Sequence, residues 1–108
     1  MGRETPMKQV LKYQLSKTTM LADGSHPLSL PFGSKVVLVG EQSGVCTLWV
    51  EQPKNSILRG LQVRRFVAHG TGRDIEDHEV YVGTYFTGPF VWHIYELNPR
   101  ESHLGPNE

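Results

Sequence analysis

The feature that most constrains this chain is a period-two alternation of apolar and polar residues, interrupted at short intervals by glycine and proline. In the segment 10–16, Leu11, Tyr13 and Leu15 alternate with polar residues, which is typical of a strand with one buried face. No segment repeats its apolar residues with the period of an α-helix, and no longer internal repeat is visible. The chain is therefore predicted to fold mainly from β-strands.

Further strand-like segments follow at 28–31, 35–42, 45–51, 57–68, 80–87 and 90–97. The dipeptide Ser43-Gly44 separates two of them by a two-residue connection, which favours an antiparallel hairpin. Gly88-Pro89 separates the last two in the same way. Apolar residues on both faces predict that 35–42 is well buried and that 90–97 is a central strand.

The long segment 57–68 contains Gly60 and the pair Arg64-Arg65, which together indicate a bend or bulge. Adjacent residues of a strand point to opposite faces, so one arginine points inward unless the strand is bulged or lies at an edge. The acidic segment 73–79 has room for one helical turn.

These observations predict a small antiparallel β-sandwich or open barrel of about six or seven strands, with at most one short helix. A single β-rich domain is expected over residues 9–97. Residues 1–8 and 98–108 lack a pattern, so both are expected to be flexible ends.

Composition narrows the function classes. Acidic and basic residues balance to a formal net charge of zero, which argues against a nucleic-acid partner. The single cysteine, Cys46, lies in an apolar strand and fits a reducing, cytoplasmic setting. No apolar segment approaches the about 18 residues that span a membrane, so no membrane partner is expected. No motif predicts a cofactor.

The most distinctive polar segment is His69-Gly70-Thr71-Gly72-Arg73, directly after a strand-like run. Two glycines around a threonine leave backbone N–H groups able to converge on an anion, although such a loop also serves as a tight connection. Arg73 would supply a bidentate contact to a phosphate.

The residues of this loop suggest several activities. His69 and Thr71 are the best pair for a hydrolase, but no nucleophile motif supports catalysis. We therefore expect the protein to have no enzymatic activity. The spacing of His69, His78 and His93 predicts no metal site. A small anionic ligand, such as a nucleotide, would use Gly70 to Gly72 and Arg73, with stacking on Trp49, Tyr85 or Trp92.

Six short motifs occur in a fixed order: K-Y-x-L at 12–15, L-P-x-G at 30–33, C-x-L-W at 46–49, H-G-T-G at 69–72, Y-V-G-T at 81–84 and V-W-H-I-Y-E at 91–96. The ordered set resembles a family of small uncharacterised bacteriophage and prophage proteins whose pattern includes a G-T-G-H loop and a terminal V-W-H strand. In this chain Arg73 stands where that pattern has histidine. The resemblance implies a phage origin and a compact accessory protein, without a mechanism.

The predicted function is accordingly that of a non-enzymatic phage accessory protein, a protein-interaction module that inhibits a host enzyme or defence complex. The small-anion binder and the hydrolase remain as alternatives, and a homodimer remains open as well as a host or phage protein partner. The candidate binding residues are His69, Gly70, Thr71, Gly72, Arg73, Arg64, Arg65 and Tyr85.

Overall fold

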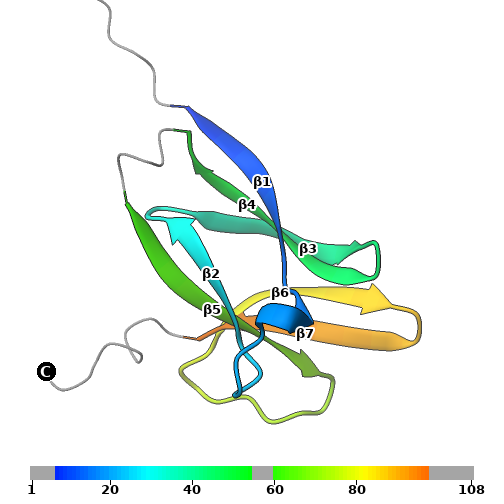
Figure 1. The fold of residues 1–108 in the computed structure, drawn as a ribbon. Coiled ribbons are helices and arrows are strands. Elements are labelled where there is room, and N and C mark those ends of the chain that lie inside the picture. Colours follow the sequence, from blue (N-terminus) through cyan, green and yellow to red (C-terminus); the bar gives the residue numbers. More distant parts are fainter. Residues whose placement is uncertain (1–6, 55–59, 98–108) are drawn as a thin grey trace, which may run out of the picture.

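The computed structural model describes residues 7–54 and 60–97 (Figure 1). In these residues the chain forms seven strands and one short 3-10 helix: β1 (Lys8–Gln14), η1 (Lys17–Thr19), β2 (His26–Pro31), β3 (Lys35–Gln42), β4 (Val45–Pro53), β5 (Leu61–Gly70), β6 (Val80–Thr87) and β7 (Phe90–Glu96). All strand pairs are antiparallel, in two sheets ordered β1-β4-β3 and β2-β5-β7-β6. The mainly β, antiparallel fold class predicted from the sequence is confirmed.

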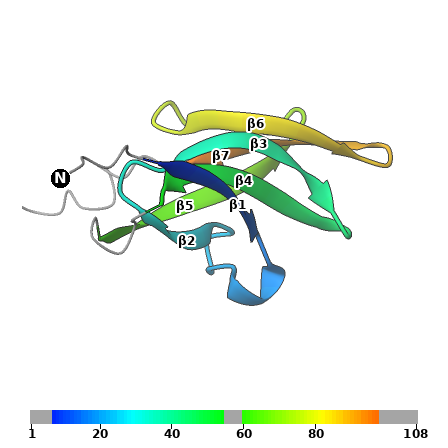
Figure 2. The same ribbon diagram turned by 90° about the horizontal axis from the view of Figure 1, so that it is seen from above.

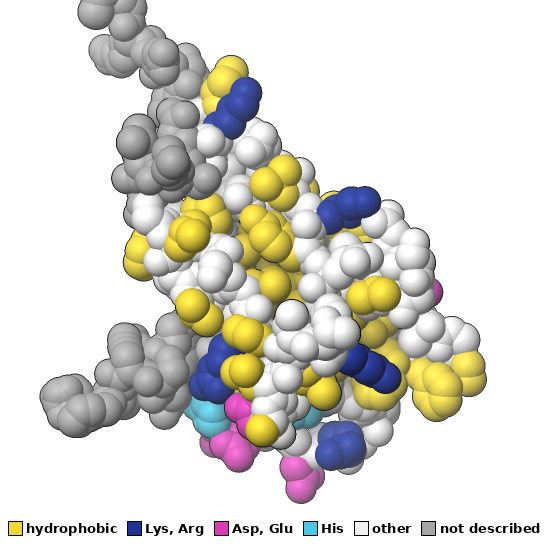
Figure 3. Space-filling view, in the orientation of Figure 1, with side chains coloured by type: hydrophobic (Ala, Val, Ile, Leu, Met, Phe, Trp, Pro, Cys, Tyr) yellow, Lys and Arg dark blue, Asp and Glu magenta, His cyan; other side chains and the backbone are white. Residues whose placement is uncertain are grey.

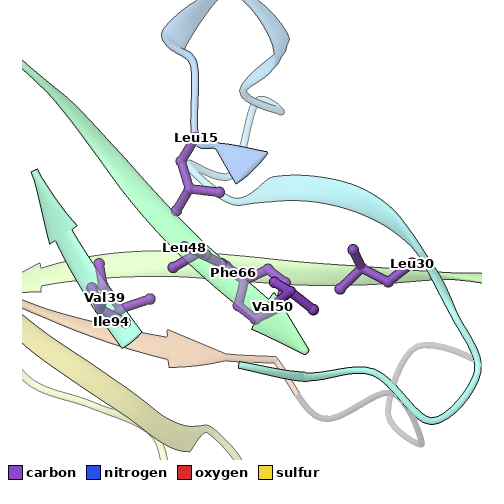
Figure 4. Packing of buried hydrophobic residues seen from close by; sticks show 7 residues of the cluster. All are labelled: Leu15, Leu30, Val39, Leu48, Val50, Phe66 and Ile94. Carbon is purple, nitrogen blue, oxygen red and sulfur yellow. The ribbon is translucent and has the colours of Figure 1, made fainter. Parts of the chain in front are cut away.

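The two sheets approach each other along one side, where β3 contacts β6 (Figure 2). On the other side the edge strands β1 and β2 are connected through η1. The core lies between the sheets and draws residues from both, as the close view in Figure 4 shows for Leu15, Leu30, Val39, Leu48, Val50, Phe66 and Ile94. Burial of each such side chain stabilises the fold by about 1.5–3 kcal/mol.

Both predicted hairpins are present. Ser43 and Gly44 connect β3 to β4 with φ of 56° and 80°, the backbone of a type I′ turn. Gly88 and Pro89 connect β6 to β7. The strand β7 lies between β5 and β6, as its two apolar faces predicted.

The prediction that 35–42 is well buried is wrong. The strand β3 is the edge of its sheet, and Val37 and Leu38 are 47% and 57% exposed. Only Val39 of β3 joins the buried core. A run of β-branched residues fits any pleated surface, so it does not reveal whether a second layer covers its outer face.

The start of the domain also differs slightly from expectation. The strand β1 begins at Lys8, which pairs with Pro53, one residue before the predicted boundary at residue 9. Its apolar face is only partly covered, because Leu11 stays 39% exposed whereas Leu15, just beyond the strand, is buried. Of the two ends expected to be flexible, 1–8 and 98–108, residues 1–6 and 98–108 lie outside the described residues.

Gly60, where a bend or bulge was predicted, has φ of 81°, and β5 begins directly after it. The neighbouring positions 57–59 lie outside the described residues. No bulge interrupts the pairing of β5 with β2, and β5 lies inside its sheet between β2 and β7. The arginine pair therefore follows the ordinary pleat, with Arg64 inward and Arg65 outward. Residues 73–79 form turns and irregular backbone instead of a helical turn.

The two sheets pack tightly against each other at Gly83 of β6. A Cβ atom built on Gly83 would lie 2.6 Å from Cγ2 of Val39 on β3, which is too close for any real contact. Gly83 follows a bulge in the pairing of β6 with β7. Glycine is thus required here by the packing of the facing sheet.

We expect Gly83→Ala to lower the free energy of unfolding by about 1–3 kcal/mol, because the added methyl group overpacks the contact with Val39. Gly40→Ala is the matched control, since its Cβ would meet Trp49 at an ordinary 3.5 Å. Urea unfolding followed by circular dichroism measures both variants. Equal stability of the two variants would contradict this account of Gly83.

Candidate functional site

Four rings meet on the outward face of the sheet β2-β5-β7-β6. Register pairs His69 of β5 with His93 of β7, and Tyr95 of β7 with Tyr81 of β6. The ring centroids of His69 and Tyr95 are 5.6 Å apart, and those of Tyr81 and Tyr95 are 5.4 Å apart, both in edge-to-face geometry. We call His69, Tyr81, His93 and Tyr95 the histidine–tyrosine face.

The carboxylate of Glu79 holds the ring of His69. Nε2 of His69 lies 2.7 Å from Oε1 of Glu79, and the two side chains are only 15% and 8% exposed. Glu79 comes from the loop between β5 and β6, so this contact ties the loop to the sheet. The pair fixes the orientation of the His69 ring.

A chain of hydroxyl groups holds the second histidine. Nε2 of His93 is 2.9 Å from Oγ1 of Thr71, and Nδ1 is 3.1 Å from Oγ1 of Thr84. Thr84 Oγ1 is in turn 2.6 Å from the hydroxyl of Tyr81. A neutral imidazole has one donor and one acceptor nitrogen, and hydroxyl groups can pair with both. The ring is therefore held without any charged partner.

The glycine loop, Gly70 to Gly72, supports this face. Gly72 has φ of 93°, a conformation that disfavours any other residue. The backbone N–H of Arg73 donates to the carbonyl of Gly70 at 3.1 Å, so one amide expected to meet an anion is used within the turn. The exposed side chain of Arg73 makes no hydrogen bond or ion pair with another described residue.

Arg64, a predicted binding residue, is instead occupied inside the fold. Its guanidinium donates to both carboxylate oxygens of Glu96, from Nε at 2.7 Å and from NH2 at 2.8 Å. NH1 donates to the carbonyl of Ser34 at 2.7 Å. The guanidinium also lies 5.8 Å from the ring centre of Phe66. Arg64 therefore connects β5 and β7 to the residue before β3 in the other sheet.

Arg65 points to the opposite side of the sheet, where NH1 lies 3.1 Å from Oδ2 of Asp23. Hydrogen bonds from Ser25 are the main reason that the pKa of Asp23 is lowered, and Arg65 adds to the effect. This partly exposed pair connects β5 to the turn before β2. Figure 3 shows charged and histidine side chains gathered at the lower edge of the molecule, with scattered hydrophobic side chains above.

Tyr85 does not share a surface with Arg73. It lies on the inward face of β6 and forms part of a pocket of about 630 Å³ between the sheets. Cys46 also lines this pocket, and burial raises the pKa of its thiol to about 11 and raises the pKa of Tyr85 as well. We call this space the inter-sheet pocket; its other walls include Leu15, Met20, His26, Val45, Ala68 and Trp92.

The structure therefore groups the predicted residues differently from the sequence. His69 and Thr71 share one surface with His93, Tyr81 and Glu79, whereas Arg64 and Tyr85 lie between the sheets. Gly70 is beside both regions, because its missing Cβ would lie 3.6 Å from the Trp92 ring. Thr84 and Glu79 were not singled out from the sequence. Alternation along β7 placed His93 and Tyr95 on one face, but their partners on β6 depend on the bulge.

A comparison with protein-family models matches residues 7–105 to a family described as Domain of unknown function (DUF7352). The chain belongs to this family. The matched residues include both sheets of the DUF7352 domain and the glycine loop. Neither the curated proteins nor the solved structures that were compared with the chain match it.

Two further structural facts concern the DUF7352 domain. Within residues 7–54 and 60–97, no three His, Cys, Asp or Glu side chains lie close enough together to hold a metal ion. In the same ranges no helix is long and apolar enough to cross a membrane.

We expect Glu96→Ala to lower the free energy of unfolding by about 3–5 kcal/mol, because it leaves the Arg64 guanidinium buried and unpaired. The double variant Arg64→Met, Glu96→Leu should recover most of that loss. Glu51→Ala is the control, since its pair with Lys8 is exposed by 36% and 70% and should cost less than about 1 kcal/mol. Equal losses for Glu96→Ala and Glu51→Ala in urea unfolding would refute the structural role of Arg64.

We also expect stability to depend on His26 between neutral and mildly acidic pH. Burial lowers the pKa of His26 below its ordinary value of 6.5. Between these two pKa values the unfolded chain binds a proton that the folded chain does not, so the free energy of unfolding falls as the pH is lowered. Urea unfolding at about pH 7.5 and 5.5 should show a smaller decrease in His26→Leu than in the unmodified protein. An unchanged decrease would assign the effect to other groups.

Proposed function

We propose that this domain is a non-enzymatic module that binds a partner protein through the histidine–tyrosine face and Arg73. The observation that carries the proposal is the fixed arrangement of four rings on three adjacent strands, each held by ring packing or hydrogen bonds. Rings that are already ordered lose little side-chain freedom on binding. Tyrosine and arginine are also enriched among residues that dominate binding energy.

The surroundings of this face indicate the chemistry of the partner. Tyr81 is 56% exposed and Phe86, on the same strand, is 71% exposed, so both offer apolar area for contact. Arg73 carries an exposed guanidinium, whose donors match a carboxylate in a bidentate manner. The proposed partner presents an apolar side chain next to a carboxylate.

Two alternatives have less support from the geometry. A hydrolase that uses His69 and Thr71 needs these residues to act together, but Thr71 pairs with His93 and His69 pairs with Glu79. A phosphate site at Gly70 to Gly72 needs free amides and an aromatic neighbour. The Arg73 amide is used within the turn, and Tyr85 lies on the inward side.

The proposal includes a bacteriophage origin and a host enzyme or defence complex as the partner. These two parts rest on the resemblance of the ordered motifs alone. Cytoplasmic action in the host belongs to the same proposal.

The test compares three forms of the protein as affinity baits in lysate of the natural host: the unmodified chain, Arg73→Ala with Tyr81→Ala, and a control. The control, Val10→Ala with Leu38→Ala, removes exposed apolar area from the other sheet. We expect the unmodified chain and the control to retain the same partner and the Arg73, Tyr81 variant to lose it. With the purified partner, Tyr81→Ala should raise Kd by about 10- to 100-fold.

Capture of the same proteins by all three forms, or of none by the unmodified chain, would contradict the proposal. Sedimentation at increasing concentration separates one remaining possibility, self-association through this face. Dimerisation that the Arg73, Tyr81 variant abolishes would replace the partner protein with a second copy of the chain.

A further inference from the structure

We propose that the domain has a second site, independent of the histidine–tyrosine face: the inter-sheet pocket binds a small uncharged molecule with an aromatic, apolar body and one hydroxyl group. Three observations lead to this assignment. They are the shape of the pocket, an unpaired polar atom in its wall, and the neutral character of its other polar groups.

The pocket lies where the two sheets separate beyond their closest contact. Gly83 touches the facing sheet, whereas Tyr85, two residues further along β6, is in the pocket wall. Ala68 shares the inward face of β5 with the fully buried Phe66, yet it is exposed because the pocket reaches it. The volume of about 630 Å³ lies within the about 300–1,000 Å³ of small-molecule sites.

The walls favour an apolar body with an aromatic ring. Leu15 and Val45 provide aliphatic surface, and Trp92 and Tyr85 provide two aromatic side chains from adjacent strands. Aromatic pairs contribute about 0.5–1.5 kcal/mol beyond the area that they bury. A flat ring between the sheets would use this surface.

His26 supplies the specific polar contact. Its residue is only 9% exposed and forms part of the pocket wall, with the ring beside the backbone of Ser16. Nδ1 is fully buried and has no hydrogen-bond partner among the described residues, so a ligand reaches it once the ring turns toward the pocket. An unpaired buried polar atom is costly, so a ligand that pairs with it gains stability. A hydroxyl group suits either tautomer of the ring, because it can accept from a ring N–H or donate to an unprotonated ring nitrogen.

The remaining polar groups of the pocket favour a neutral ligand. Burial lowers the pKa of His26 and raises the pKa of Cys46 and of Tyr85, so all three groups are uncharged near neutral pH. Lys17 is the one cation among the lining residues, and it lies exposed on η1. A carboxylate deep in the pocket would therefore lose its hydration without an opposite charge beside it.

The experiment titrates the full-length, ¹⁵N-labelled protein with 2-naphthol, naphthalene and 2-naphthoate, and follows its ¹H–¹⁵N spectrum. We expect 2-naphthol to shift the amide signals of Cys46, Ala68 and Tyr85 and the indole N–H of Trp92. It should bind about 3- to 10-fold more tightly than naphthalene, the factor expected for one added hydrogen bond. The charged 2-naphthoate should bind most weakly.

Variants separate the parts of the proposal. Ala68→Leu fills the pocket and should abolish binding of both 2-naphthol and naphthalene. His26→Leu should lower the affinity for 2-naphthol until it equals the affinity for naphthalene. Leu38→Ala, at an exposed position of the other sheet, is the control and should bind as the unmodified protein does. If His26→Leu does not fold, the comparison of 2-naphthol with naphthalene on the unmodified protein decides the role of the hydroxyl group.

Several results would overturn the assignment. One is that 2-naphthol does not bind, or that it binds without shifting the signals of the pocket residues. Another is equal binding by Ala68→Leu, and a third is tighter binding of 2-naphthoate than of 2-naphthol. Shifts of the pocket signals on dilution alone would show that a second copy of the chain fills this space. Binding of a partner protein to the outer face is measured separately, so either site can fail without the other.

Discussion

The packing of Val39 against Gly83 is the contact on which the arrangement of the two sheets depends. It lets β3 and β6 approach closely enough to close one side of the sandwich, although the two strands belong to different sheets. A side chain at Gly83 would separate them. Because the sheets are held together at this point, the space between them widens along β6 toward Tyr85. The inter-sheet pocket is thus a consequence of where the close contact lies.

Two buried polar groups on the inward side of one sheet differ in how they are paired. Arg64 and Glu96 form a bidentate pair, and the Ser34 carbonyl accepts a further hydrogen bond from the guanidinium. His26 lies across β5 from Glu96, since both are paired with Phe66 in the sheet, yet its Nδ1 has no hydrogen-bond partner among the described residues. Buried polar groups in proteins are nearly always paired. The contrast within one small core is what singles out His26 as a place for a ligand.

The outer face and the inter-sheet pocket share the end of β5. His69 and Thr71 contribute to the histidine–tyrosine face, while Gly70 between them leaves room for the Trp92 ring on the inner side. Neighbouring residues of a strand alternate between faces, so three consecutive residues serve both surfaces. The histidine–tyrosine face and the inter-sheet pocket are thus close in space, but each proposed site rests on its own contacts.

The sequence by itself determined the strands, the hairpins and the class of fold. Alternation and turn residues act over a few positions, so Ser43-Gly44 and the segments around it specify their local structure without help from distant residues. It also singled out His69 and Thr71, and it predicted that one of Arg64 and Arg65 points inward unless the strand is bulged or lies at an edge. It did not show that 35–42 is an edge strand, nor that Tyr85 faces away from Arg73.

Only the tertiary structure decided which strand lies at an edge, which face is covered and which polar groups are paired. Arg64 meets Glu96 from 32 residues away, and the hydroxyl of Thr71 meets His93 from 22 residues away. Such partners depend on the order of strands in the sheet and on the bulge at Tyr81 and Gly83. Strand pairing between distant segments is set by the packing of the whole core, and the period-two pattern of each strand is compatible with several such orders.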